Sequence, residues 1–346
     1  MGKNSMRVAM YYNNRDVRIE EIQTPQIGTG ELLVKVRASG ICGSDVMEWY
    51  RIKKAPLVLG HEIAGEIVAL GEGVKRFKVG DRVTVAHHVP CNTCHYCLNG
   101  HYSVCETLRT TNFYPGGFSE YVRIPQINVD RGTFLLPDDV SFEEGTFAEP
   151  LACTLLGQKK ANLRPGQSIL VIGSGISGLL HIQLARALGA GRICAVDITD
   201  YRLKMAKQCG ADIIIHAKED VPACLRKAND GRLADLVIVC TGAPSAIQQA
   251  FNSADRGGTI LFFAPTEPNA ITPMNLWDLW RNCNSIIMSY AGPPDDTAAS
   301  IELIRAGRVK VRELITHRLP LAEAALGFKL VAEAKDSIKV IIEPQK

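Results

Sequence analysis

Four cysteines in one short segment constrain this chain more than any other feature. They are Cys91, Cys94, Cys97 and Cys105, in a polar stretch punctuated by Gly and Pro. Four thiolates at this spacing suit a tetrahedral Zn²⁺ with no open position, which is typical of a structural site rather than a catalytic one. Disulfides or unrelated thiols are the alternatives, but the spacing is regular and the rest of the chain resembles an intracellular protein. We expect a structural zinc lobe over about residues 87–106.

Composition narrows the class of protein. The chain has 346 residues, of which 46% are hydrophobic and 22% charged, so it can bury large cores and hold two domains. The formal net charge of +3, with no Lys/Arg cluster around the cysteines, argues against nucleic-acid binding. No apolar run reaches the ~18 residues of a membrane span, and no secretory signal is evident. Eleven cysteines without an export signal indicate a reducing compartment, so we expect a cytoplasmic protein.

The pattern of apolar runs changes near Phe142. Before it, short β-branched runs separated by Gly and Pro predict an irregular β-rich barrel. These runs cover residues 32–36, 63–69, 82–86 and 119–124. From Ser168 onward, apolar strands alternate with helical segments, which is typical of a parallel doubly wound sheet. A helical segment at 296–306 and a strand at 338–342 follow, and we expect this tail to return to the first domain.

A glycine-rich turn follows the predicted strand 169–172 and precedes a helical run that starts at Ile176. Gly173, Gly175 and Gly178 form the GxGxxG pattern of a dinucleotide site. They permit the tight turn, the approach of a pyrophosphate and close packing of helix on strand. The N–H groups at the start of the helix would bind the phosphates.

Asp197 ends the next predicted strand, about 20 residues beyond the glycine turn. A carboxylate here accepts hydrogen bonds from the ribose hydroxyls and repels a 2′-phosphate, which favours NAD over NADP. The alternative is that Asp197 only caps the helix that follows. Arg202, in that helix, joins the predicted cofactor-binding residues.

A second set of potential metal ligands lies upstream. Cys42 follows one apolar run, and His61 and Glu62 follow another. Glu149 lies where the pattern of the chain changes. A thiolate, an imidazole and a carboxylate can hold a zinc that keeps a position for substrate, and such a zinc lowers the pKa of a bound alcohol. Asp45 is a candidate partner for the other nitrogen of His61.

The pattern G-H-E-x2-G-x5-G-x2-V is met from Gly60 to Val74. With the four cysteines and the glycine turn, it resembles the zinc-containing medium-chain alcohol/polyol dehydrogenase family over essentially the whole chain. The resemblance implies an α/β fold in which a GroES-like, β-rich catalytic domain comprises residues 1–149 and 289–346. A doubly wound Rossmann domain that binds NAD would be inserted at 150–288.

The resemblance also implies site residues. Cys42, His61 and Glu149 would bind a catalytic zinc, the second zinc of the chain, and Glu62 would be able to exchange onto it. With a glutamate at position 149, the chain is similar to the sorbitol and threonine dehydrogenase branch of the family. Three further positions match residues that contact the cofactor: Thr241, Gly242 and Lys339.

One position departs from the family's C-x-S/T-D-x-H element, in which a hydroxyl passes the substrate proton to a histidine. Ser44 is present, but Met47 replaces the histidine, and a thioether cannot relay a proton. We expect Ser44, the cofactor ribose and solvent to carry the proton. His88 is a candidate base with a pKa near ~6.5 unless perturbed. It is equally compatible with an exposed loop residue.

These features predict a zinc- and NAD-dependent dehydrogenase of a secondary alcohol, such as a polyol, cyclitol or sugar derivative. L-threonine 3-dehydrogenase is the alternative enzyme, because Glu149 and His88 are compatible with it. A zinc-stabilised NAD-binding protein without turnover is the non-enzyme alternative, although the predicted catalytic residues are present. Both metal motifs disfavour a zinc-free quinone reductase.

By analogy with bacterial polyol dehydrogenases, we expect a homo-oligomer, and a tetramer rather than a dimer. We expect a small-molecule substrate and neither nucleic acid nor membrane as partner.

Overall fold

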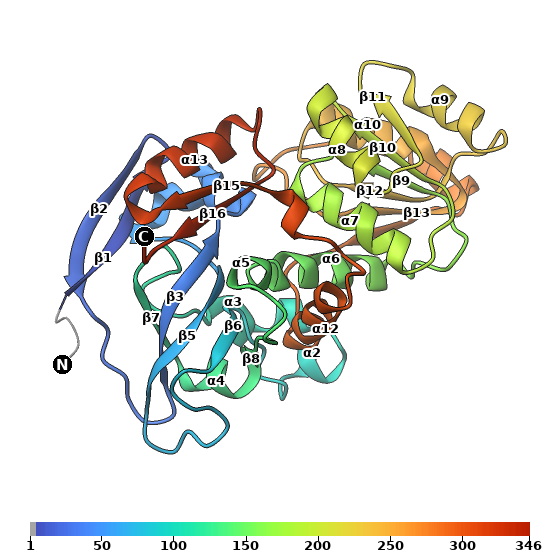
Figure 1. The fold of residues 1–346 in the computed structure, drawn as a ribbon. Coiled ribbons are helices and arrows are strands. Elements are labelled where there is room, and N and C mark those ends of the chain that lie inside the picture. The colour runs from blue at the N-terminus through green and yellow to red at the C-terminus, as the bar shows by residue number, and fades with distance from the viewer. Residues whose placement is uncertain (1–4) are drawn as a thin grey trace. The chain divides into compact units, whose positions relative to one another are not determined.

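A computed structural model describes residues 5–346, and the chain divides into two compact units (Figure 1). The first unit comprises residues up to 152 together with 292–346, and the second comprises 153–291. The tail of the chain therefore rejoins the unit in which the chain begins. The sequence placed the two boundaries slightly earlier, at 149/150 and 288/289.

Antiparallel pairing dominates the first unit. Its strands are β1 (Ser5–Asn13), β2 (Asp16–Gln23), β3 (Leu32–Gly40), β4 (Leu57–Val58), β5 (Glu62–Leu70), β6 (Arg82–Ala86), β7 (Tyr121–Ile124), β8 (Thr133–Leu135), β15 (Ile315–Pro320) and β16 (Lys339–Glu343). A seven-stranded sheet has the order β15-β16-β3-β5-β6-β8, with β7 also paired to β3, and a three-stranded sheet has the order β2-β1-β4. The runs predicted between residues 32 and 124 all lie in these strands or extend into them.

Most helices of the first unit are short. They are α1 (Glu48–Arg51), α2 (His95–Leu98), α3 (Glu106–Thr110), α4 (Gln126–Gly132), α5 (Phe142–Gly145), α12 (Pro294–Arg305) and α13 (Ala324–Glu333), with 3₁₀ turns η1 (Gly43–Val46), η2 (Ile52–Lys54), η3 (Tyr102–Val104), η4 (Arg312–Leu314) and η5 (Leu321–Glu323). Helix α13 anchors the tail, because the buried ring of Phe328 lies 5.6 Å from that of Tyr11 and 5.5 Å from that of Phe118.

The second unit contains one parallel sheet with the strand order β11-β10-β9-β12-β13-β14. The strands are β9 (Ile169–Ile172), β10 (Ile193–Asp197), β11 (Ile213–His216), β12 (Ala234–Val239), β13 (Ala254–Phe262) and β14 (Ser285–Met288). The helices are α7 (Ile176–Ala187), α8 (Asp200–Gln208), α9 (Val221–Ala228), α10 (Pro244–Ser253) and α11 (Leu276–Arg281), while α6 (Ala148–Lys160) crosses the boundary between the units. Strands β9 and β10 are buried along their whole length, as central parallel strands covered on both faces must be.

The predicted α/β fold, with a GroES-like part and a Rossmann part, is confirmed, but the sequence did not predict the pair β11 and α9. Strand β11 is at the edge of its sheet and buries only Ile215, so its apolar signal is weak. Helix α9 carries Pro222 in its first turn, after a cap by Asp220. No helix within residues 5–346 is long and apolar enough to cross a membrane.

Candidate active site and metal centres

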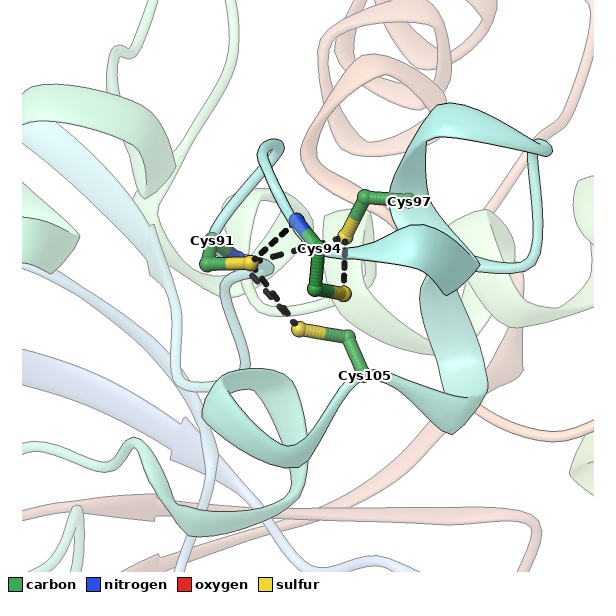
Figure 2. A group of neighbouring side chains, drawn as sticks. All are labelled: Cys91, Cys94, Cys97 and Cys105. Atoms are coloured by element: carbon green, nitrogen blue, oxygen red, sulfur yellow. Dashed lines mark hydrogen bonds between the residues drawn. The ribbon is translucent and has the colours of Figure 1, made fainter.

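The thiols of the four cysteines in the loop after β6 converge on one point (Figure 2). The Sγ of Cys91 lies 3.6 Å from that of Cys105 and 3.9 Å from that of Cys97, and the Sγ atoms of Cys94 and Cys97 are 3.6 Å apart. A tetrahedron with Zn–S bonds of ~2.3 Å has edges of about 3.8 Å. The four thiols therefore fit a zinc ion that would have no position left for substrate.

Backbone N–H groups stabilise a thiolate in this cluster. The N–H groups of Thr93 and Cys94 point at the Sγ of Cys91, with N···S distances of 3.5 and 3.2 Å. These hydrogen bonds lower the pKa of Cys91 to about 5, which favours the thiolate that zinc binds. Burial raises the pKa of Cys97 to about 12, so this thiol needs the charge of a metal to ionise.

Replacing Cys97 with Ser should act on stability rather than on chemistry. Loss of one ligand should remove the structural zinc and lower the thermal midpoint by about 5 °C or more, because a structural zinc contributes several kcal/mol to folding. Differential scanning calorimetry and metal analysis test this, with Cys283→Ser as control because Cys283 is exposed and outside both clusters. An unchanged midpoint with two zinc ions per chain would contradict the assignment.

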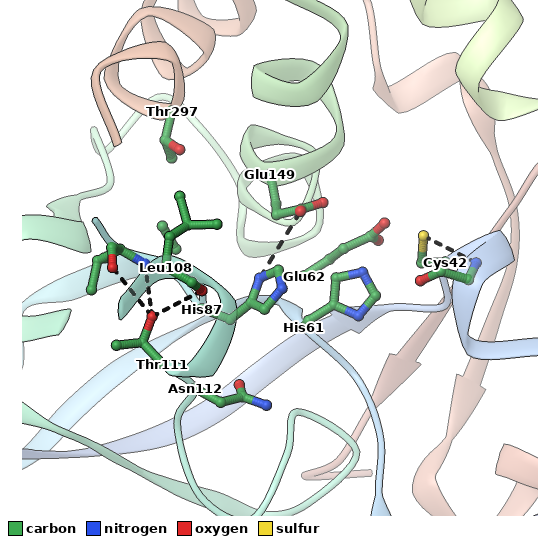
Figure 3. Close-up of polar contacts among 12 residues, drawn as sticks. Cys42, His61, Glu62, His87, Leu108, Thr111, Asn112, Glu149 and Thr297 are labelled. Carbon is green, nitrogen blue, oxygen red and sulfur yellow. Dashed lines mark hydrogen bonds and ion pairs between the residues drawn. The ribbon is translucent and has the colours of Figure 1, made fainter. Parts of the chain in front are cut away.

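A second cluster of possible metal ligands consists of Cys42, His61 and Glu62. One ligand atom from each lies within 4.8 Å of the others, and Cys42 and His61 appear side by side in Figure 3. Cys42 caps η1, and Glu62 begins β5 directly after His61. Gly60 has φ +93°, and a Cβ there would lie 2.9 Å from the backbone N of Phe118, so only glycine makes this turn. Three ligands of these types leave a position open on zinc.

Asp45 supports two members of this cluster, as the sequence predicted for His61. Its fully buried carboxylate places Oδ1 3.3 Å from Nδ1 of His61 and accepts a 3.0 Å hydrogen bond from the backbone N of Cys42 through Oδ2. Because Nδ1 faces Asp45, Nε2 is the nitrogen left for a metal. Burial alone would lower the pKa of His61, but the charges of Asp45 and Cys42 raise it well above its usual range.

Glu62 is buried against Lys339. The Nζ of Lys339 donates to Oε2 of Glu62 and, at 3.3 Å, to the carbonyl of Ile41. Gly40 provides the space, because a Cβ there would overlap the Glu62 carboxylate. Oε1 of Glu62 is buried with no hydrogen-bond partner in the described part of the chain, so it is the oxygen available to a cation. The cofactor contact expected of Lys339 stays a prediction, since its ammonium is fully buried in this ion pair.

Glu149 lies outside the group formed by Cys42, His61 and Glu62. Its carboxylate faces Nδ1 of His87 at 4.0 Å, and the ring of His87 lies 4.8 Å from that of His61 (Figure 3). The structure therefore places Glu62 rather than Glu149 beside the thiol and imidazole. The role of Glu149 as a zinc ligand stays a prediction.

His88 lies beside His87, with 3.8 Å between the ring centroids. Burial, with the charges of His61 and Arg51, lowers the pKa of His88 to about 4. A base with the ordinary pKa of ~6.5 would lose activity below that pH. With a pKa of about 4, His88 is neutral throughout the physiological range, and any acid limb that it causes should appear near pH 4.

In the second unit, the predicted glycine turn joins β9 to α7. Gly173 has φ +94°, and Gly175 caps the helix that begins at Ile176. A Cβ at Gly178 would overlap the carbonyl oxygen of Gly173, so glycine is required for the helix to pack against the turn. The geometry suits a pyrophosphate at a helix N-terminus.

Asp197, at the end of β10, connects that strand to the glycine turn. Its Oδ2 accepts from the backbone N of Ser174 at 2.8 Å, and Oδ1 accepts from the N and Oγ1 of Thr199, both at 3.0 Å. Oδ2, which accepts a single hydrogen bond, keeps a lone pair that can accept from a ribose hydroxyl, so the capping role and the cofactor role are compatible. Thr241 and Gly242 follow the end of β12, which is the strand next to β9 in the sheet.

Arg202, in α8, brings a positive charge to the same turn. Its guanidinium lies 4.0 Å from the position that a Cβ of Gly175 would take. The buried Nε has no hydrogen-bond partner, and no carboxylate within the described residues forms an ion pair with this side chain. An arginine without a countercharge beside a phosphate-binding turn suits an anionic ligand.

Family models match both units of the chain. A model described as the alcohol dehydrogenase GroES-like domain matches residues 28–133, and one described as zinc-binding dehydrogenase matches residues 177–306. The chain belongs to the zinc-type medium-chain alcohol dehydrogenase family. The family resemblance read from the sequence is thereby confirmed.

Relatives in this family span the whole chain. A sorbitol dehydrogenase of Bacillus subtilis is 34% identical over 355 residues, covering 99% of this chain and 98% of the relative. An L-threonine 3-dehydrogenase of Symbiobacterium thermophilum is 32% identical and covers 94% of each chain. A solved structure from Sinorhizobium meliloti, described as a candidate zinc-binding dehydrogenase bound to NADP, superposes with a TM-score of 0.88 at 26% identity and covers 99% of this chain and 100% of its own.

No sequence motif marks two further residues of the candidate active site. His87 directly follows the buried strand β6 and is only 9% exposed. That position at the end of a buried strand was the available signal. Arg51, which contacts Ser44 and Asp45, carried no motif signal because its contacts depend on how α1 folds back on η1.

Proposed function

We propose that the protein is a zinc-dependent oxidoreductase that transfers a hydride between a secondary alcohol and NAD. The observation that carries this proposal is the group of Cys42, His61 and Glu62, whose ligand atoms lie within 4.8 Å of one another in a chain of the zinc-type family. The relation to sorbitol dehydrogenase supports a polyol, cyclitol or sugar derivative as the substrate.

The chain's own residues would have distinct tasks in this reaction. Zinc at this site would polarise the alcohol oxygen, and NAD would accept the hydride. Asp45 fixes the orientation of His61, and Lys339 balances the charge of Glu62. The Oγ of Ser44 would accept the alcohol proton while its own proton leaves for solvent.

A substrate panel tests the proposal. NADH absorbance is followed with polyols, inositols, sugar phosphates and L-threonine, using protein as purified, after chelation and after zinc is restored. We expect the highest kcat/KM with a polyol, cyclitol or sugar derivative, with activity lost on chelation and recovered with zinc. Turnover by the chelated protein at the original rate would contradict zinc dependence.

L-threonine 3-dehydrogenase is the second candidate function. Buried His87 beside Glu149, with His88 next to it, favours this function, as does a threonine dehydrogenase 32% identical to this chain. Highest kcat/KM with L-threonine would select it. Binding of NAD without turnover of any compound in the panel would select the non-enzyme alternative.

Cofactor choice should depend on Asp197 and Arg202 together. NAD should be preferred because a 2′-phosphate would face the Asp197 carboxylate, although the NADP-bound relative shows why both cofactors need testing. Asp197→Ser should raise kcat/KM with NADP at least tenfold relative to NAD, since it removes a repulsion and leaves Arg202 available. Adding Arg202→Gln should cancel that gain. If the parent uses NADP as well as NAD, the assignment of Asp197 to the ribose is wrong.

We propose further that the expected homo-oligomer includes contacts through the edge of the second unit. Strand β14 has no partner on its outer side in the described sheet. Exposed apolar side chains occur in β14 and in α11, the helix that precedes it in the chain: Met288 at 64%, Leu276 at 68%, Trp277 at 61% and Trp280 at 70%. A second copy could extend the sheet across a twofold axis and cover these side chains.

Trp280→Glu should weaken this association. A charge at the centre of the apolar surface would be buried without a partner, so the assembly should dissociate toward the 37.8 kDa monomer. Sedimentation velocity measures the change, with Val79→Glu as control because Val79 is 59% exposed on the other unit. An unchanged sedimentation coefficient for Trp280→Glu would exclude this surface.

A further inference from the structure

Arg51, at the end of α1, contacts the predicted proton-transfer residue Ser44 at two atoms. Its Nε donates to the carbonyl oxygen of Ser44 at 2.9 Å, and its Nη2 donates to Oγ at 3.1 Å. The same Nη2 lies 3.5 Å from Oδ1 of Asp45. The side chain of Arg51 is only 15% exposed, so these contacts are largely protected from water.

The guanidinium of Arg51 is held in place from several sides. It stacks on the ring of Tyr50, 4.6 Å from the ring centroid. The buried carboxylate of Asp45, which also faces His61 at 3.3 Å, supplies its countercharge. A planar fork held in this way has a defined orientation, which a flexible lysine would not have. Arg51 and Asp45 therefore connect Ser44 to His61 through one polar network.

We propose that Arg51 is a positioning residue that aims the Ser44 hydroxyl for proton transfer. Met47 cannot relay a proton, and Arg51 cannot either, because a guanidinium has donors and no acceptor. It can instead occupy one lone pair of Oγ and so fix the directions of the other lone pair and of the O–H bond. This inference rests on the proposed dehydrogenase function.

The proton balance of the step follows from this arrangement. During oxidation the O–H bond of the alcohol breaks, and its proton bonds to the free lone pair of the Ser44 Oγ. The proton that Ser44 carried leaves along the O–H direction to solvent, so Ser44 ends with the same charge. Without Arg51 the hydroxyl could occupy three staggered positions instead of one. A misplacement of about 1 Å at such a group can reduce the rate by ~10²-fold.

The first test does not depend on turnover. Crystal structures of the zinc-loaded parent and of Arg51→Gln, at matched resolution, report the side-chain conformation of Ser44. We expect one rotamer in the parent and more than one, or a different one, in the variant. Zinc content should stay at the parent level, because Asp45 still faces His61. A single unchanged Ser44 rotamer in Arg51→Gln would overturn the proposal.

The second test is a double-mutant cycle on kcat, run with the best alcohol of the panel. Arg51→Gln should lower kcat by about 10- to 100-fold with KM changed less than threefold, and Arg51→Lys should recover only part of the loss. In a Ser44→Ala background, Arg51→Gln should cost less than threefold, because its effect passes through Ser44. Equal losses in both backgrounds would overturn the proposal.

Lys53→Met is the matched control for Arg51→Gln. It removes an exposed positive charge two residues away that forms no hydrogen bond with Ser44 within the described residues, so kcat should be unchanged. A comparable loss in Lys53→Met would assign the effect to local charge and overturn the positioning role. Absence of turnover by the parent would reject the dehydrogenase function, whereas the rotamer comparison would still decide whether Arg51 orients Ser44.

Discussion

Cys42→Ala should reduce alcohol oxidation by several decades, on the order of 10³-fold or more, while the chain remains folded. Zinc bound by two remaining ligands would be held weakly, and the charge that develops on the alcohol oxygen would lose several kcal/mol of stabilisation. The fold should survive because the four-thiolate cluster and the cores of both units lie elsewhere. Steady-state kinetics and zinc analysis of the same preparation measure both effects.

The control for this variant is Cys283→Ala, which removes an exposed thiol outside both clusters and should leave the rate and two zinc ions per chain unchanged. Cys42→Ala should retain one zinc, at the four-thiolate cluster, and a thermal midpoint near that of the parent. Near-normal kcat in Cys42→Ala would remove Cys42 from the catalytic site. A collapse of thermal stability would mean that the group of Cys42, His61 and Glu62 has a structural role.

The metal-ligand groups and the glycine turns could be predicted from the sequence because their geometry is set by residues close together in the chain. The spacing of four cysteines between residues 91 and 105 and the glycines of the turn after β9 act within one loop, so their geometry is encoded where they occur. The turn after Gly60 is similarly local, because a positive φ allows only a few residue types. These motifs predicted the four-cysteine group and the group of Cys42, His61 and Glu62, whereas the role of Glu149 as a zinc ligand stays a prediction.

Contacts between distant segments explain what the sequence did not predict. Lys339 lies 277 residues from Glu62 and reaches it because β16, in the tail, pairs antiparallel with β3 beside β5. Nothing in the local sequence around either residue predicts that pairing. The position of His87 against Glu149 likewise depends on how α6 packs near the end of β6. Such contacts follow from sheet order, which a single sequence specifies only weakly.

The buried pair of Lys339 and Glu62 should be important for stability. Lys339→Met should lower the free energy of unfolding by about 3–5 kcal/mol, because it would leave the Glu62 carboxylate, 1% exposed, without its countercharge. Denaturant unfolding of metal-free protein measures the loss. Adding Glu62→Gln to Lys339→Met should recover most of it, since the double variant buries no unpaired charge.

Two comparisons separate this electrostatic effect from lost packing. Lys329→Met, on α13, removes a lysine that is 67% exposed and pairs with Glu333 at 3.9 Å, so stability should change by less than about 1 kcal/mol. In zinc-loaded protein a cation held by Cys42, His61 and Glu62 would replace the missing positive charge. The loss caused by Lys339→Met should therefore be smaller with zinc than without it. Equal losses in both states, with no recovery in the double variant, would mean that Lys339 acts by filling space and that the Glu62 carboxylate does not bind the metal.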